Sequence, residues 1–219
     1  IKIAPIPNTN FTTIPNEGCN PTTAIFTDAT TIFSGNVISW AWDFGDGNLD
    51  SVQNTSNSYQ TAGIYDAQLI TVSNHGCADT LLLIDTVSIY PIPNPMFDLD
   101  TFACTLQDVN FTNNSTGVNL TYSWDFGDGN ISTLENPVHQ YSTVGVYTVC
   151  LTILSSDGCD STICKNVTIA NPSAGFTSNT QYLPCPNDSI NFTDLSVNAI
   201  GWHWSFGDGD TSIAQNPSH

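Results

Sequence analysis

The chain lacks arginine altogether, and its 219 residues include only two lysines, Lys2 and Lys165. Against these stand 20 acidic residues, so the formal net charge is −18. Binding to nucleic acid or to an anionic membrane surface depends on basic side chains that neutralise phosphate. The composition therefore argues against both kinds of partner.

Long hydrophobic runs and helical patterns are missing too. No stretch approaches the roughly 20 apolar residues of a membrane helix, and no signal segment opens the chain. No stretch of ten or more residues combines helical periodicity with capping residues. Charged residues make up 10% of the chain, against roughly 25% in ordinary soluble domains, and Asn, Ser and Thr replace them. We expect a secreted or cell-surface β protein.

What the chain has instead is an internal repeat. An aromatic strand and an acidic glycine turn occur three times, at Trp42, Trp124 and Trp204, about 80 residues apart, which is the length of one domain. Proline-containing segments at 5–8, 91–95 and 170–173 separate the copies and favour short, stiff connectors.

These boundaries define the expected domains. We expect repeats at 9–92, 93–174 and 175–219, with the third incomplete and residues 1–8 forming the end of a preceding repeat and a linker.

Alternation within each copy predicts β-strands. Trp40, Trp42 and Phe44 fall on one side of a strand, and this aromatic side should face the core. Turn signals separate short runs, with a spacing that fits about seven strands per copy. We expect an all-β fold of tandem β-sandwiches.

Three motifs follow one another in the second copy and recur in part in the other two. Copy two reads WDFGDG, then NPxHxY from Asn136 to Tyr141, then GxYxVxL from Gly145 to Leu151. Copy one lacks the Pro and His of the second motif, and copy three has Ser205 in place of the first motif Asp. Together these motifs resemble the polycystic kidney disease (PKD) repeat. The resemblance implies immunoglobulin-like PKD domains in an extended array, as in surface adhesins and beside the catalytic domains of secreted hydrolases.

Four of the seven cysteines stand at matching places in the first two copies. Cys19 and Cys77 in copy one correspond to Cys104 and Cys159 in copy two, so we expect each pair to close its own sandwich. Cys185 takes the first of these places in copy three. Persisting disulfides indicate an oxidising compartment outside the cytosol.

Two further cysteines, Cys150 and Cys164, straddle the turn Asp157-Gly158 symmetrically. They should lie opposite each other on a hairpin and form a bridge, and copy one lacks both together. A free reactive thiol or a metal site is the alternative, but no His accompanies the cysteines at zinc-ligand spacing.

The acidic turns suggest a calcium site, the one cofactor that we consider. Asp43, Asp46 and Asp50 could converge in copy one, as could Asp125 and Asp128 in copy two, because Ca²⁺ prefers carboxylate oxygens. The alternative is a plain hairpin turn, in which Asp-Gly supplies positive φ angles and the first Asp binds nearby backbone groups.

Two hypotheses concern glycans. Trp40, Tyr122 and Trp202 lie at the outer end of each aromatic stripe and could stack on sugar rings, although core packing explains the same residues. Four Asp-Ser/Thr-aliphatic triplets resemble the acceptor pattern of bacterial O-glycosylation, and the alternative at each is an unmodified, exposed strand residue. The candidate acceptors are Ser51, Thr80, Thr86 and Ser189.

Signatures of catalysis are weak. The four histidines are scattered, and no nucleophile elbow, zinc-protease helix or phosphate-binding glycine loop occurs. We expect a non-enzymatic structural or adhesive stalk or filament subunit, whose partners are further repeats, other copies of the chain or surface glycans. The alternative is a spacer or substrate-binding accessory region of a secreted enzyme that degrades polysaccharide or protein.

The incomplete third copy suggests how copies could join. A sandwich without its last strands exposes an apolar face that a strand of another chain can cover. The segment 1–4 resembles such a strand, so head-to-tail filaments are one hypothesis. The alternative is that the chain was cut.

Overall fold

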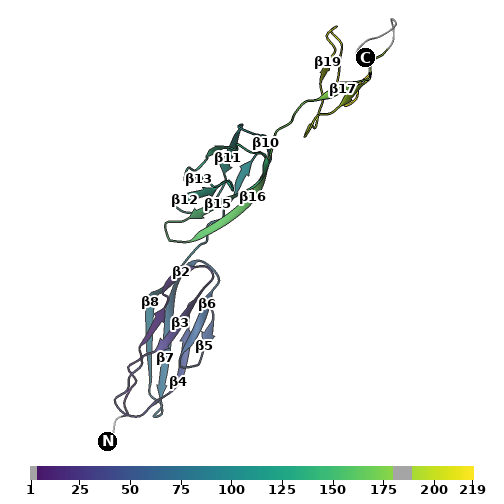
Figure 1. The fold of residues 1–219 in the computed structure, drawn as a ribbon. Helices are drawn as coiled ribbons and strands as arrows, with labels where there is room; N and C mark the ends of the chain where they lie inside the picture. Colours follow the sequence, from purple (N-terminus) through teal and green to yellow (C-terminus); the bar gives the residue numbers. More distant parts are fainter. Residues whose placement is uncertain (1–3, 180–188) are drawn as a thin grey trace. The chain divides into compact units, whose positions relative to one another are not determined.

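The computed structural model describes residues 4–179 and 189–219, and in these ranges it contains β-strands and no helix (Figure 1). The first repeat contains β1 (Phe11–Ile14), β2 (Glu17–Cys19), β3 (Thr22–Asp28), β4 (Val37–Asp43), β5 (Leu49–Asp50), β6 (Thr55–Tyr59), β7 (Gly63–Ser73) and β8 (Ala78–Tyr90). The all-β prediction is confirmed.

The second repeat has matching strands. They are β9 (Phe97–Leu99), β10 (Phe102–Cys104), β11 (Asp108–Asn113), β12 (Thr121–Asp125), β13 (Ile131–Ser132), β14 (Val138–Gln140), β15 (Gly145–Leu154) and β16 (Asp160–Ala170). The described part of the third repeat contains β17 (Phe176–Ser178), β18 (Phe192–Asp194), β19 (Trp204–Ser205) and β20 (Thr211–Ser212).

Each of the first two repeats is a sandwich of a five-stranded and a three-stranded sheet. The strand orders are β2-β8-β7-β4-β5 and β1-β3-β6 in the first, and β10-β16-β15-β12-β13 and β14-β11-β9 in the second. The predicted tandem immunoglobulin-like sandwich fold is therefore confirmed. In the third repeat, β17 pairs with β18 and β19 with β20, and the described residues include no counterpart of β15 and β16.

One strand pairing in each sandwich is parallel. β2 runs parallel to β8, with Cys19 beside Tyr90, and β10 runs parallel to β16, with Cys104 beside Ala170. The strand that carries the first cysteine of a repeat thus ends where the last strand of that repeat ends.

The aromatic stripe forms the core of each sandwich, as alternation predicts. Trp42 and Phe44 are buried in the first repeat, and Trp124 and Phe126 in the second. Trp40, two residues before Trp42 on β4, is partly buried against this core. Because aromatic side chains bury large apolar areas, these residues contribute strongly to the stability of each domain.

In the first two repeats, the first glycine of the acidic turn packs closely against the next long strand. Gly45 has a φ of +76°, and a Cβ there would lie 2.4 Å from the carbonyl oxygen of Asp66 on β7. Gly127 has a φ of +78°, and its Cβ would lie 2.5 Å from the carbonyl oxygen of Thr148 on β15. Only glycine fits such a position.

The chain divides into two compact units. One comprises Ile1–Met96, Ser115–Tyr122 and Thr152–Thr162, and the other comprises Phe97–Asn114, Ser123–Leu151 and Ile163–His219. The tip of the β15–β16 hairpin of the second repeat therefore belongs to the unit that contains the first repeat.

Candidate functional site

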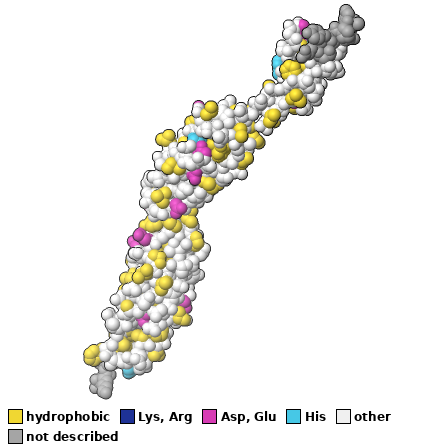
Figure 2. Space-filling model, in the orientation of Figure 1, with side chains coloured by type: hydrophobic (Ala, Val, Ile, Leu, Met, Phe, Trp, Pro, Cys, Tyr) yellow, Lys and Arg dark blue, Asp and Glu magenta, His cyan; other side chains and the backbone are white. Residues whose placement is uncertain are grey.

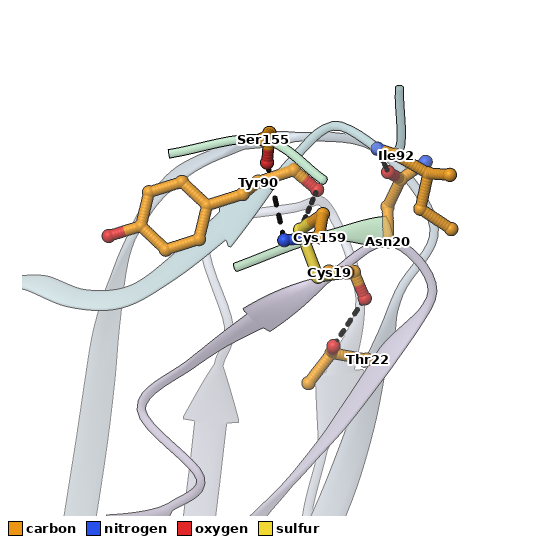
Figure 3. The surroundings of a disulfide bond; sticks show 7 residues. All are labelled: Cys19, Asn20, Thr22, Tyr90, Ile92, Ser155 and Cys159. Carbon is orange, nitrogen blue, oxygen red and sulfur yellow. Dashed lines mark hydrogen bonds between the residues drawn. A yellow bond between two sulfur atoms is a disulfide. The ribbon is translucent and has the colours of Figure 1, made fainter. Parts of the chain in front are cut away.

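A disulfide joins the first repeat to the second. It connects Cys19 at the end of β2 with Cys159 just before β16, with Cα atoms 5.7 Å apart (Figure 3). Both cysteines lie in the same compact unit, and Cys159 is fully buried. Since 140 residues separate the two positions in the chain, the bond encloses most of both repeats in one covalent loop.

Hydrogen bonds hold both ends of this disulfide (Figure 3). The Cys159 amide donates to Ser155 Oγ at 3.2 Å. The Ser155 amide in turn donates to the Cys159 carbonyl at 2.8 Å. On the other side, the Asn20 amide donates to the Tyr90 carbonyl at 3.0 Å, and Cys159 Sγ lies 4.0 Å from the same carbonyl oxygen. The end of β8 thus forms part of the junction.

The predicted pairings Cys19–Cys77 and Cys104–Cys159 are wrong. Cys77 precedes β8, whereas Cys19 lies beside Tyr90 at the other end of that strand. β8 has 13 residues, and a strand of that length separates its ends by about 40 Å. A disulfide needs Cα atoms within about 7 Å of each other. In the second repeat β16 separates the two cysteines in the same way, and Cys77 and Cys104 are free and partly exposed.

The predicted bridge between Cys150 and Cys164 is confirmed, with Cα atoms 4.1 Å apart. It joins the neighbouring strands β15 and β16 across 14 residues of sequence. The corresponding residues of the first repeat, Gln68 and Leu82, also lie directly opposite each other. This bond therefore braces one hairpin and connects no two repeats.

The carboxylates of the acidic turns bind their own backbone. Asp43 Oδ1 accepts the Gly45 amide at 2.9 Å, and Asp46 Oδ1 accepts the Asn48 amide at 3.0 Å. The second repeat has the same two bonds. Such bonds are typical of short turns that begin with Asp.

The structure does not bring the predicted calcium ligands of the first repeat together. Asp50 lies on β5, where its carboxylate accepts hydrogen bonds from the Ser51 amide and the Thr55 hydroxyl. Asp43 and Asp46 serve the turn before it. The predicted pair in the second repeat, Asp125 and Asp128, serves the equivalent turn there. Turn geometry, rather than ion binding, accounts for where these carboxylates lie.

A different acidic group does cluster in the third repeat. The ligand atoms of Asp208, Asp210 and His219 all lie within 4.8 Å of one another, and the three residues are exposed. Among the described residues no other trio of acidic, His or Cys side chains is as close. His219 Nε2 forms a hydrogen bond with Asp208 Oδ2 at 2.7 Å, so the cluster is also explained as a braced turn.

The second of the two carboxylates in each turn, Asp46 or Asp128, is bound by a side chain from a later strand. That side chain differs between the first two repeats. In the first repeat Asn57 Nδ2 donates to Asp46 Oδ2 at 2.7 Å. In the second, His139 Nε2 forms a hydrogen bond with Asp128 Oδ2 at 2.7 Å, and the imidazole stacks on the Phe126 ring with centroids 4.3 Å apart. His139 thus has a structural role in the turn of the second repeat.

Burial and hydrogen bonding act in opposite directions on Asp128. Burial raises the pKa of this carboxyl, but the hydrogen bonds from His139 and from Asn130 together lower it by more. The pKa of Asp128 therefore lies below its ordinary value. The folded state therefore favours the charged form of Asp128.

Two buried tyrosines tie the turn to the core. Tyr59 donates its hydroxyl to the Phe44 carbonyl at 3.1 Å, and Tyr141 donates to the Phe126 carbonyl at 3.0 Å. Burial raises the pKa of Tyr59 to about 12 and raises that of Tyr141 also. The neutral phenol is part of each folded repeat.

One set of residues with a clear structural role was not among the candidates predicted from the sequence. An asparagine after each motif accepts, through Oδ1, the backbone amide of a residue on another strand. The pairs are Asn54 with Asp28, Asn136 with Asn113, and Asn216 with Asp194. The equal offset of these asparagines from the motif was the signal that could have identified them.

The outer aromatic residues are partly buried. Trp40 donates Nε1–H to Asp28 Oδ2 at 2.8 Å. Tyr122 and Trp202 are also partly exposed. Trp202 lines a cleft in the third repeat with Phe176 and other aromatic residues. Stacking on sugars stays a prediction.

The candidate glycosylation residues lie at the surface. Ser51, Thr80 and Ser189 are exposed, and Thr86 is partly exposed and donates its hydroxyl to the Leu83 carbonyl. On the face of the molecule drawn in Figure 2, acidic side chains are scattered among uncharged groups rather than gathered in one patch. O-glycosylation stays a prediction as well.

The third repeat leaves part of its aromatic face open. Phe176 is 62% exposed, whereas Phe97, at the corresponding place in the second repeat, is fully buried. Strand complementation by another chain stays a prediction. No helix in the described residues has the length and apolarity that crossing a membrane requires.

A comparison with protein families identifies the family of the first two repeats. The model of the PKD domain matches residues 3–89 and 91–171, which together are more than half of the chain. The chain belongs to the PKD domain family. The first two PKD domains are therefore the two sandwiches that the Cys19–Cys159 bond connects.

Similar sequences occur in much longer proteins. The chain is 34% identical over 82 residues to a microbial collagenase of Vibrio alginolyticus (36% of this chain, 10% of that protein). It is 43% identical over 58 residues to the collagenase ColA of Bacillus cereus (26% of this chain, 6% of that protein). The chain thus spans a tenth or less of these two relatives.

Among solved structures, the PKD1 domain of Vibrio anguillarum Epp is similar. Its sequence identity is 26% and its TM-score 0.34, and the match covers 38% of this chain and 95% of that chain.

Proposed function

We propose that this chain is a non-enzymatic part of an extracellular stalk or filament whose PKD domains are joined covalently so that the array resists extension. The Cys19–Cys159 bond carries this proposal. A force that stretches the chain passes from β2 through the two sulfur atoms to β16. The 140 residues between the cysteines are then outside the path of the force.

The chemistry of the chain supports an extracellular location. Two disulfides form among the six cysteines of the described residues. Thiols are kept reduced in the cytosol, whereas structural disulfides persist outside it. Each domain also has its own aromatic core, so the array needs no partner to fold its first two domains.

Single-molecule stretching tests the proposal directly. The chain is pulled from both ends, first oxidised and then in a thiol reductant. We expect reduction to release about 140 residues, which corresponds to roughly 480 Å of extra contour length.

Two double variants sharpen this test. Without reductant, C19S/C159S should extend to its full length less the roughly 14 residues that the Cys150–Cys164 bond still encloses. C150S/C164S is the matched control, because it also lacks one disulfide but keeps the bond between repeats, and its hidden length should equal that of the wild type. Equal extension of the wild type before and after reduction would contradict the proposal.

A second candidate is an accessory region of a secreted protease, and the similarity to two collagenases favours it. In that case the domains space or orient a catalytic domain on an insoluble substrate. Co-sedimentation of the chain with fibrillar collagen distinguishes the candidates. A stalk segment should stay in the supernatant at all collagen concentrations, whereas saturable retention, abolished by soluble collagen peptides, would favour the accessory role.

A further inference from the structure

The free Cys77 occupies the same position in the β7–β8 hairpin turn of the first repeat as the bonded Cys159 occupies in the β15–β16 hairpin turn of the second. The Cys77 amide donates to Ser73 Oγ at 3.3 Å, and the Ser73 amide donates to the Cys77 carbonyl at 2.8 Å. The corresponding distances at Cys159 and Ser155 are 3.2 and 2.8 Å. We call Cys77 and Cys159 the hairpin cysteines.

The surroundings of the Cys77 sulfur also match. Cys77 Sγ lies 3.9 Å from the Ala4 carbonyl oxygen, and Cys159 Sγ lies 4.0 Å from the Tyr90 carbonyl oxygen. Ala4 and Tyr90 each precede the same four residues, Pro-Ile-Pro-Asn. Tyr90 is the residue that lies beside Cys19 in the parallel register. Ala4 thus corresponds to Tyr90, and the position beside Ala4 corresponds to the position of Cys19 in the bonded junction.

The free Cys104 repeats the geometry of the bonded Cys19 at the other end of a repeat. Cys104 ends β10 beside Ala170, as Cys19 ends β2 beside Tyr90. The next amide, that of Thr105, donates to the Ala170 carbonyl at 3.1 Å, and this matches the bond of 3.0 Å from Asn20 to Tyr90. We call Cys19 and Cys104 the strand-end cysteines.

From these matches we propose that Cys77 and Cys104 are halves of further disulfides between repeats. A strand-end cysteine of a preceding PKD repeat bonds to Cys77, and a hairpin cysteine of a following PKD repeat bonds to Cys104. The bonded pair Cys19–Cys159 shows the rule, in which the strand-end cysteine of one repeat joins the hairpin cysteine of the next. This inference rests on the proposed function and extends it from one junction to the array.

The bonds form by thiol–disulfide exchange. The two thiols lose two protons and two electrons to a disulfide oxidant, either a small molecule or a protein, which leaves as two thiols. Cys77 and Cys104 are both partly exposed, so an incoming thiol and the oxidant can reach them.

Such bonds have a mechanical consequence. The loop closed by Cys19 and Cys159 contains both Cys77 and Cys104. A bond from Cys104 to a later repeat therefore overlaps this loop, and so does a bond from Cys77 to an earlier one. Overlapping loops leave no repeat free to extend without breaking a disulfide.

Disulfide mapping of the native full-length protein tests the inference. The protein is isolated from its source without reductant, free thiols are alkylated, and the chain is cut beside Asp and after Lys. Asp residues separate Cys19, Cys77, Cys104, Cys150 and Cys159 from one another, and Lys165 separates Cys164 from Cys185. Cross-linked peptides are then identified by mass spectrometry.

We expect both Cys77 and Cys104 to be protected from alkylation. The peptide of Cys77 should be bonded to one from the second strand of another PKD repeat, and that of Cys104 to one that follows a hairpin turn. The same mapping on C104S should reveal one newly alkylated hairpin cysteine. The control C164S should instead expose only Cys150.

The size of the unreduced protein tells where the partner repeats lie. A single-chain mass places them in the same polypeptide, and a ladder of multiples places them in other copies. Both results agree with the inference.

Alkylated Cys77 and Cys104, or a bond from either to Cys185, would overturn the inference. If Cys19–Cys159 is found in that experiment, only the inference fails. If reduction leaves the extension of the chain unchanged, the proposed function fails.

Discussion

The first two repeats use one core and one turn but brace them differently. In the first repeat Asn57 holds the turn carboxylate, and no disulfide crosses the β7–β8 hairpin. In the second, His139 holds it while stacked on an aromatic ring, and Cys150–Cys164 crosses the equivalent hairpin. The aromatic motif therefore determines the fold, and the braces around it vary without changing that fold.

Removing the shared core should affect both repeats most and equally. Trp42→Ala and Trp124→Ala each remove a fully buried indole that donates a hydrogen bond to a loop carbonyl, of Val52 or Leu134. We expect each to lower the free energy of unfolding of its own repeat by about 3–5 kcal/mol. Hydrogen exchange followed by mass spectrometry measures each repeat separately, and a clearly smaller loss in one repeat would show that the cores are not equivalent.

Removing the hairpin disulfide should affect the second repeat alone. The bond closes a loop of 14 residues, for which chain entropy predicts a stabilisation of about 3 kcal/mol. C150S/C164S should therefore lose hydrogen-exchange protection in β15 and β16, while β7 and β8 keep theirs. Q68C/L82C is the reciprocal variant, because these residues face each other in the first repeat. Loss of protection in both repeats would contradict independent bracing.

Exchanging the polar brace should have a smaller effect. His139→Asn keeps a donor for Asp128 but loses the ring stacked on Phe126. We expect the second repeat to lose about 1 kcal/mol, the usual worth of an aromatic contact beyond its buried area. Denaturant unfolding measures this loss, and the variant Asn57→His in the first repeat serves as the reverse comparison. No change in His139→Asn would show that stacking contributes nothing.

Acid should produce the smallest difference. The pKa of Asp128 is lower in the folded state than its ordinary value, so the unfolded chain binds this proton more readily. The stabilisation is fully present above the ordinary pKa of about 3.9 and is lost as the pH falls through the folded value. Asp128→Asn should flatten the dependence of stability on pH in that window, measured by tryptophan fluorescence. An unchanged slope would assign the acid sensitivity to other carboxylates.

Much of the fold could be predicted from the sequence because the aromatic alternation recurs. Trp42 and Trp124 are buried as expected, and Cys150 and Cys164 are opposite each other because symmetry about a turn fixes hairpin register. Local patterns are sufficient for features that one strand or one hairpin determines.

The cysteine pairing could not be predicted in the same way. Equal positions in two copies say which cysteines correspond, but they do not say which end of a sandwich each occupies. The parallel pairing of β2 with β8 decides this, since it places Cys19 at the far end of β8 from Cys77. That pairing is non-local and leaves no short sequence signal. The convergence expected for Asp43, Asp46 and Asp50 failed for a similar reason, because the turn backbone claims the first two carboxylates.

The most direct test of the covalent junction is the partner of Cys19 in the oxidised 219-residue chain. Cleavage beside Asp and after Lys without reduction places Cys19, Cys77 and Cys159 on different peptides. We expect one cross-linked species that contains Cys19 and Cys159, with Cys77 and Cys104 alkylated in the isolated chain. A species that contains Cys19 and Cys77 would show instead that each sandwich is closed by its own bond, and the proposal of a covalently joined array would be withdrawn.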